Sequence, residues 1–168
     1  MARDRGFEKT VSIFISILLE NLLARLRCLR YLPKNGAIVE VNKSKMLVFP
    51  KNGAIHEESF LHKKREVSCT EHLIGDGVLK EGDVALDAGA NIGYYVLIES
   101  QLVGPNEKVY AVEPVRGNFE LLKKNVQLNN VKNVDTFQVA FGEHNEKSKI
   151  YVSNFSNLCS MDKKFSCR

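Results

Sequence analysis

Hydrophobic residues at the start of the chain recur three or four positions apart, from Val11 to Leu29. This spacing predicts an amphipathic helix within residues 1–34. Glu20 and Asn21 end the apolar run before it reaches the roughly 18 residues of a membrane-spanning helix, and no small-residue cleavage site of a secretory signal follows. We expect this helix to pack on the rest of the protein or on a second copy. The alternatives are peripheral membrane contact through its basic end, and a disordered segment or an incorrectly assigned start.

Residues 35–62 are predicted to form a small β-hairpin that precedes the main domain. The hexapeptide PKNGAI occurs twice, at Pro33–Ile38 and Pro50–Ile55, and its Asn-Gly pair is a strong turn signal. We expect strands at Ala37–Val41 and Lys45–Phe49, joined by a loop at 42–44. Two copies are too few for a solenoid repeat.

From residue 63 onward, short apolar runs alternate with helical patterns, which is the order of a parallel α/β sheet. Strands are expected at 84–86, where all three residues should be buried, at 108–112 and at 134–140, with an optional short strand at 149–152. Helices are expected at 63–79, 93–102 and 116–129. In the last helix we expect Phe119, Leu122 and Val126 to face the sheet, and Lys123 and Lys124 to face water.

The segment at 83–95 reads DVALDAGANIGYY and is typical of a ligand-binding turn between a strand and a helix. Asp87 ends the strand. Gly89 and Gly93 permit positive φ angles and a close ligand approach, because glycine has no Cβ. Glu113, at the tip of the next strand, is an acceptor suited to two ribose hydroxyls. These residues predict the nucleotide-binding half of an α/β fold. The alternative is a turn that only joins two elements, with Glu113 as a solvated acid.

The glycine pattern argues against a dinucleotide. The NAD fingerprint is G-x-G-x-x-G, and its middle glycine is missing from Gly89-Ala90-Asn91-Ile92-Gly93. Asp87 would also meet the pyrophosphate with like charge. S-adenosylmethionine fits better, because its adenosine suits Glu113, and its ammonium and sulfonium suit the acidic side of the turn.

Three stretches resemble the FkbM-type methyltransferases, a class I group that uses S-adenosylmethionine. They are LDAGANIGYY, VYAVEPVRGNFELLKKNVQLNN and VDTFQVAFGE, within residues 65–152, or about half of the chain. The resemblance implies a Rossmann-like class I methyltransferase fold and O-methylation of a hydroxyl on a sugar or small metabolite. By position, it implies that Glu113 holds the ribose and that Ala140 lies near the adenine. It also implies that the methionine part is lined by Asp87, Gly89, Ala90, Asn91 and Gly93.

The fold is expected to be partial. The family it resembles has about seven strands, and only three parallel strands are identifiable here within residues 63–156, followed by an irregular tail at 157–168. Right-handed crossovers would leave the first strand with one open edge. The chain is therefore expected to be a fragment truncated at its C-terminus. Alternatively, it is completed by a partner or a second copy through the open edge, or is a decayed relative.

Charge and cysteine content narrow the function further. The net charge of +4 lies entirely in residues 1–34, and the remainder holds seventeen residues of each sign, so no nucleic-acid partner is expected. Cys28, Cys69, Cys159 and Cys167 form no C-x-x-C pair, which favours buried thiols in a cytoplasmic protein, although the last two could pair.

The four histidines are scattered, so no metal site is expected and no catalytic base is named. The sequence thus predicts a methyltransferase with a small-molecule or saccharide acceptor. A non-catalytic cofactor-binding or interaction module, and more weakly an NAD-dependent oxidoreductase, are the alternatives.

Overall fold

The computed structural model describes residues 35–50, 56–57, 59–60, 73–144, 146–152 and 159. All of them belong to one compact unit, Lys34–Arg168, and residues 1–33 form a second unit. The predicted N-terminal helix, most of the second PKNGAI copy, most of the helix expected at 63–79, and nearly all of the tail lie outside the described residues. So do Cys28, Cys69 and Cys167. No helix within the described ranges is long and apolar enough to cross a bilayer.

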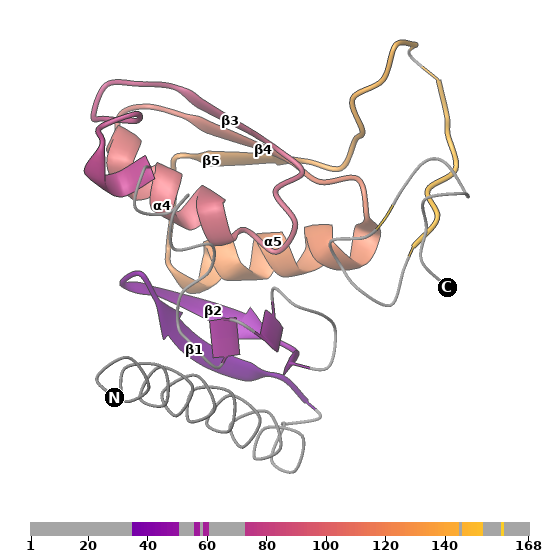
Figure 1. Ribbon diagram of the computed structural model, residues 1–168, viewed down its shortest axis with the longest axis horizontal. Coiled ribbons are helices and arrows are strands. Elements are labelled where there is room, and N and C mark those ends of the chain that lie inside the picture. The colour runs from indigo at the N-terminus through magenta and orange to yellow at the C-terminus, as the bar shows by residue number, and fades with distance from the viewer. Residues whose placement is uncertain are drawn as a thin grey trace, which may run out of the picture. The chain divides into compact units, whose positions relative to one another are not determined.

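A three-stranded parallel sheet organises the main part of the chain, in the order β3-β4-β5 (Figure 1). Its strands are β3 (Ala85–Ala88), β4 (Val109–Val112) and β5 (Val134–Phe137). They are joined by the helices α4 (Tyr94–Val103) and α5 (Arg116–Leu128). This arrangement is a partial Rossmann-like α/β fold, and it confirms the predicted fold class. The strand expected to run to residue 140 ends at Phe137, and at 149–152 only an isolated bridge forms, at Tyr151.

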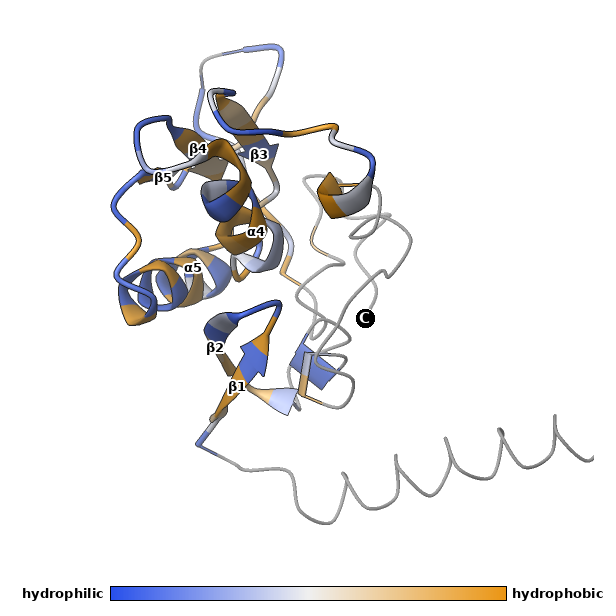
Figure 2. Ribbon diagram, turned by 90° about the vertical axis from the view of Figure 1, so that its left-hand side faces the viewer, coloured by the Kyte–Doolittle hydropathy of each residue, from blue (hydrophilic) through white to orange (hydrophobic). Residues whose placement is uncertain are grey.

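Both helices pack on the same face of the sheet. Strand residues alternate between faces, and Ala85, Val109 and Ala111 point toward the helices, where Leu122 and Val126 of α5 complete one core cluster. The predicted inward face of α5 is therefore confirmed, although Phe119 is only partly buried. In Figure 2, α4 is coloured mostly hydrophobic, whereas α5 mixes hydrophobic and hydrophilic residues, as expected for a helix with one solvent face.

The opposite face of the sheet is open in the part of the chain that the structure describes. Val84 is 58% exposed and Leu86 is 61% exposed, so the prediction that this strand is buried throughout was wrong. The physical reason is that α4 and α5 pack on the same side of the sheet. Leu86 and Tyr110 on the other side are therefore exposed, whereas Val112, at the end of β4, is buried. In the described residues β3 pairs with β4 alone, which agrees with the predicted open edge.

The antiparallel hairpin forms from β1 (Ala37–Val41) and β2 (Ser44–Val48). Asn42 and Lys43 have φ angles of 47° and 64°, as a two-residue type I′ turn requires. The predicted three-residue loop was therefore wrong, because Ser44 already pairs with Val41. The apolar face of the hairpin joins α4 in a second core cluster, formed by Val41, Met46, Val48, Ile92, Tyr94, Leu97 and Ile98.

Asparagine side chains of α5 occupy the free edge of β2. The Leu47 N–H donates to Asn125 Oδ1 at 2.7 Å, and the Lys45 N–H donates to Asn129 Oδ1 at 2.8 Å. Asn129 Nδ2 donates in return to the Lys45 carbonyl at 2.7 Å. Two asparagines one helical turn apart therefore form hydrogen bonds with the backbone of Lys45 and Leu47, two residues apart on β2. They take the place of a neighbouring strand.

The two faces of the sheet predict opposite mutational costs. Leu122→Ala removes a side chain that is fully buried, and should lower the free energy of unfolding by about 2–5 kcal/mol. Leu86→Ala, on the open face, should change it by less than about 0.5 kcal/mol. Urea denaturation of both variants measures this difference. Equal costs would mean that another part of the protein covers Leu86.

Candidate functional site

The turn after β3 wraps around the tip of β4. The Gly89 and Ala90 N–H groups both donate to the Val112 carbonyl, at 2.8 and 3.0 Å. The Asn91 N–H donates to Glu113 Oε2 at 2.9 Å. The structure therefore brings the predicted turn and the predicted acid together at the carboxyl ends of two parallel strands.

Glu113 is buried rather than solvated. Its side chain is 4% exposed, and its Oε1 accepts the Val115 N–H at 2.8 Å and a longer bond of 3.5 Å from Asn118 Nδ2. The carboxylate thus caps the start of α5 while it holds the turn at Asn91. An ionised carboxylate offers about four acceptor positions, so these contacts leave little capacity for a ligand.

The two glycines of the turn have different reasons to be glycine. Gly89 has φ +90°, and a Cβ there would meet nothing within 4 Å. Gly93 has φ +89°, but a Cβ there would lie 2.7 Å from Leu122 Cδ1. Gly89 thus leaves room for a ligand, whereas Gly93 allows α4 to pack closely on α5. Ala90 is buried in the core cluster as well, at 5% exposure.

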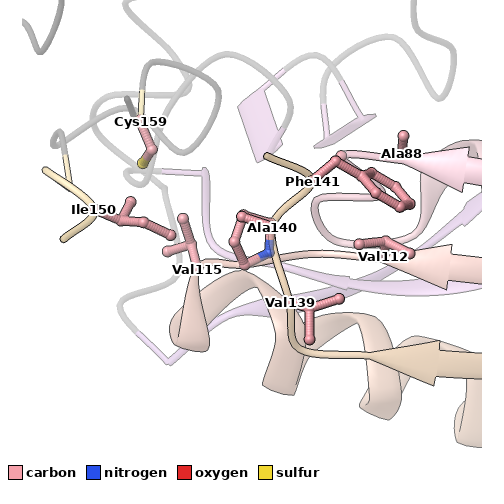
Figure 3. Close-up of a pocket in the computed structure, with 10 residues that line it drawn as sticks. Ala88, Val112, Val115, Val139, Ala140, Phe141, Ile150 and Cys159 are labelled. Carbon is pink, nitrogen blue, oxygen red and sulfur yellow. The ribbon is translucent and has the colours of Figure 1, made fainter. Parts of the chain in front are cut away.

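An uncharged cavity of about 280 Å³ opens beside this turn. Figure 3 shows that side chains from the ends of β3 and β4 and from the segment after β5 converge on it. Its lining includes the predicted residues Gly89 and Ala140. Asp87, Ala90, Asn91, Gly93 and Glu113 do not line it. The remaining lining residues are Ala88, Val112, Pro114, Val115, Val139, Phe141, Ile150 and Cys159.

Sequence reasoning missed most of this lining. Val139 lies within the strand predicted at 134–140, and Phe141 directly follows it. Because β5 ends at Phe137, these residues instead lie in the loop beyond the sheet. The position of Ile150 and Cys159 had no signal in the sequence, since their approach to the cavity depends on the path of the chain after β5.

Two further carboxyl groups continue from Glu113: Asp87 interacts electrostatically with Glu113, and Glu99 interacts with Asp87. Burial, with a second contribution from the Glu113 carboxylate, raises the pKa of Asp87 to about 6. Burial also raises the pKa of Glu99 to about 7, with a second contribution from Asp87. Glu99 Oε2 is enclosed and has no hydrogen-bond partner among the described residues. Sequence analysis missed Glu99, although it is the single charged residue of the apolar helix α4.

The histidines in the described ranges have different surroundings. His56 is buried, and its Nδ1 accepts the Phe49 N–H at 3.1 Å, so it serves the end of the hairpin. Burial lowers the pKa of His56 to about 4. His144 is exposed, and His62 and His72 lie outside the described residues. Among the described side chains, no group of three or more His, Cys, Asp or Glu could hold a metal ion.

Comparisons with known proteins find methyltransferases. The chain is 34% identical over 56 residues to a protein-L-isoaspartate O-methyltransferase of Methanothrix thermoacetophila. It resembles the structure of a SAM-dependent methyltransferase from Aquifex aeolicus at 30% identity, with a TM-score of 0.39, over 42% of this chain and 37% of that one. It also resembles M. jannaschii TYW2 in complex with AdoMet at 19% identity, with a TM-score of 0.48, over 63% and 44% of the two chains.

These similarities are partial. The 56-residue match covers 33% of this chain and 27% of the curated relative. No family model matches the chain, so the FkbM subtype has no support beyond the sequence motifs themselves.

The raised pKa values predict that stability falls with increasing pH. Both carboxyl groups bind protons more tightly in the folded protein, so their stabilising contribution is complete below pH 3.8–4.5 and is lost as the pH rises through about 6 and 7. Glu99→Gln should remove part of this loss and raise the free energy of unfolding at pH 8 by about 2 kcal/mol. Urea denaturation from pH 4 to pH 8 measures it. Glu120→Gln, on the exposed side of α5, is the control, and a Glu99→Gln curve parallel to the wild type would contradict the prediction.

The two glycines should respond differently to alanine. At Gly89 the cost is only the left-handed backbone, about 1–2 kcal/mol. At Gly93 the same strain is joined by the clash with Leu122, which adds about 1–3 kcal/mol. Thermal unfolding should therefore place Gly93→Ala below Gly89→Ala. The reverse order would show that α4 and α5 do not depend on this close approach.

Proposed function

We propose that this chain belongs to a class I methyltransferase that uses S-adenosylmethionine. The observation that carries the proposal is the uncharged cavity of about 280 Å³ at the carboxyl ends of the parallel strands, beside the turn that Glu113 holds. Open α/β sheets bind ligands at this edge. The match of 56 residues to an O-methyltransferase supports the same reaction class.

Within the proposal, the described residues divide the cofactor between them. Ala140 lies beside the adenine, because it lines the apolar cavity. Gly89 lines the same cavity, where the absence of a side chain lets the methionine part approach the turn. Glu113 accepts the ribose hydroxyls with the capacity that its own contacts leave free. Asp87 provides negative charge for the ammonium and sulfonium end, and its raised pKa makes that charge depend on pH near neutrality.

The turn's own hydrogen bonds favour this cofactor over NAD. A pyrophosphate needs free backbone N–H groups at the glycine turn. The N–H groups of Gly89 and Ala90 are bonded to Val112, and that of Asn91 is bonded to Glu113. The Gly93 N–H donates to the Ala90 carbonyl at 2.8 Å. An anion at this turn would therefore have to break contacts that hold the site together.

The class of methyl acceptor is inferred from the family resemblance alone. FkbM-like motifs suggest a hydroxyl of a sugar or small metabolite. Because the sulfonium supplies an activated methyl group, the protein's main task is to hold the two reactants in line. The described residues to which we assign a role all serve cofactor binding.

A non-catalytic cofactor-binding module is the second candidate. The observation in its favour is the open face of the sheet, where Leu86, Tyr110 and Phe137 are 61%, 37% and 44% exposed. Parallel sheets normally have both faces covered, and in the described residues this face of the sheet is not. Binding of cofactor without methyl transfer to any acceptor would favour this candidate.

Calorimetric titration with S-adenosylmethionine, S-adenosylhomocysteine and NAD tests the proposal. We expect the first two to bind and NAD not to bind. Glu113→Gln should weaken binding of S-adenosylmethionine by roughly tenfold or more, since a hydrogen bond to a charged group contributes about 1.5–3 kcal/mol. Glu120→Gln is the matched control and should bind like the wild type.

Because Glu113 also caps α5, titrations belong at a temperature where circular dichroism shows both variants to be folded. Binding of NAD alone would exclude the methyltransferase proposal. Equal affinities of the wild type and a folded Glu113→Gln variant would remove Glu113 from the cofactor site.

A further inference from the structure

Asn125 of α5 connects the hairpin to the candidate cofactor turn. Its side chain is completely buried, at 0% exposure. Oδ1 accepts the Leu47 N–H of β2 at 2.7 Å, and Nδ2 donates to the Ile92 carbonyl of the turn at 2.8 Å. One buried amide therefore satisfies backbone groups from two segments that are 45 residues apart in the sequence, since Leu47 and Ile92 differ by 45 positions.

The bond to Ile92 acts on the peptide unit that closes the turn. The Ile92 carbonyl and the Gly93 N–H belong to the same planar peptide group. The Gly93 N–H donates to the Ala90 carbonyl at 2.8 Å. By fixing the carbonyl on one side of this plane, Asn125 also orients the N–H on the other side. The direction of the turn at its entry into α4 is thus held from outside the turn.

Asparagine is suited to this position by its chemistry. The site needs an acceptor toward Leu47 and a donor toward Ile92, and a side-chain amide offers both on one short, rigid group. Alanine would leave a buried N–H and a buried carbonyl without partners. An ionised aspartate would satisfy Leu47 but could not donate to Ile92.

We propose that Asn125 is a positioning residue for cofactor binding, and that through it the hairpin holds the glycine turn in its binding geometry. This inference rests on the proposed function, since it concerns the same site. It gives the hairpin a part in that site, because β2 supplies the N–H that keeps the Asn125 amide in place.

Asn129 offers a matched control. It lies one helical turn after Asn125 and holds the same strand through two bonds to Lys45. Asn129 Nδ2 also donates to the Asn125 carbonyl of α5, at 2.7 Å. Asn129→Ala should remove the bonds to Lys45 and leave the bonds of Asn125 to Leu47 and Ile92 in place.

The experiment measures affinity for S-adenosylmethionine by calorimetry, at a temperature where every variant is folded. Asn125→Ala should raise Kd about tenfold, within the range by which residues outside a ligand site alter binding. Asn129→Ala should change Kd by less than about twofold. Equal Kd values for both variants, with binding by the wild type intact, would overturn the inference and leave the proposed function standing.

Amide hydrogen exchange provides a second measurement that does not need the cofactor. Asn125→Ala should speed exchange at Asn91 and Gly93, whose N–H groups close the turn, and Asn129→Ala should not. If the wild type binds no S-adenosylmethionine, the proposed function fails and the positioning role in cofactor binding fails with it. The exchange data then decide whether Asn125 orders the turn at all.

If Asn125→Ala does not fold, Asn125→Asp replaces it, because it has the same size and keeps the acceptor for Leu47. Protonation of the aspartate restores a donor for the Ile92 carbonyl. The ratio of the Kd of Asn125→Asp to the Kd of the wild type should therefore fall toward 1 as the pH is lowered from 8 to 5. A ratio that does not change with pH would contradict the inference.

Discussion

The binding of the glycine turn to the tip of β4 is the constraint on which the rest of the site depends. The chain must leave β3, reverse, and enter α4 within a few residues, and its buried N–H groups need partners. The Val112 carbonyl and the Glu113 carboxylate supply them. Because one partner ends β4 and the other caps α5, this contact sets where α4 and α5 start, and the cavity opens beside it.

That contact also has an electrostatic consequence. Burial at this contact raises the pKa values of Asp87 and Glu99 to about 6 and 7, with smaller contributions from the charge of Glu113 on Asp87 and of Asp87 on Glu99. Burying carboxyl groups near one another destabilises the folded protein as the pH rises. These carboxyl groups lie near the edge of the sheet where we propose that the cofactor binds, and a cationic ligand there would offset this destabilisation. Sites that bind ligands commonly keep such unfavourable groups.

The alternation of helices and strands, the turn and Glu113 were predictable because each has a local signal. Hydrophobic period, glycine pairs and a strand-end acid can be recognised without knowing what lies opposite them. The exposure of Leu86 could not be predicted, since it depends on α4 and α5 sharing one face. The burial of Asn118, Asn125 and Asn133 could not be predicted either, because the sequence does not show which groups a polar side chain will bond to in the fold. Asn133, for example, donates to the Ser100 and Gly104 carbonyls at the end of α4. The sequence indicated that Gly93 matters. That a side chain at this position would clash with Leu122 could not be predicted, because it depends on how the two helices pack.

The hairpin shows why such buried amides matter more than their number suggests. Its apolar residues share a core cluster with α4, and apolar contacts alone would tolerate small shifts of one element against the other. The hydrogen bonds of Asn125 and Asn129 do not tolerate such shifts, because Asn125 binds one backbone group of β2 and Asn129 binds two, each with a narrow range of distance and angle. A one-residue slip of β2 would turn its opposite face to the core and leave Asn125 unsatisfied. The same amide reaches Ile92, so the register of the hairpin and the geometry of the turn are fixed by one side chain. Hydrophobic burial therefore brings the hairpin to α4 and α5, and the asparagines determine its alignment with the glycine turn.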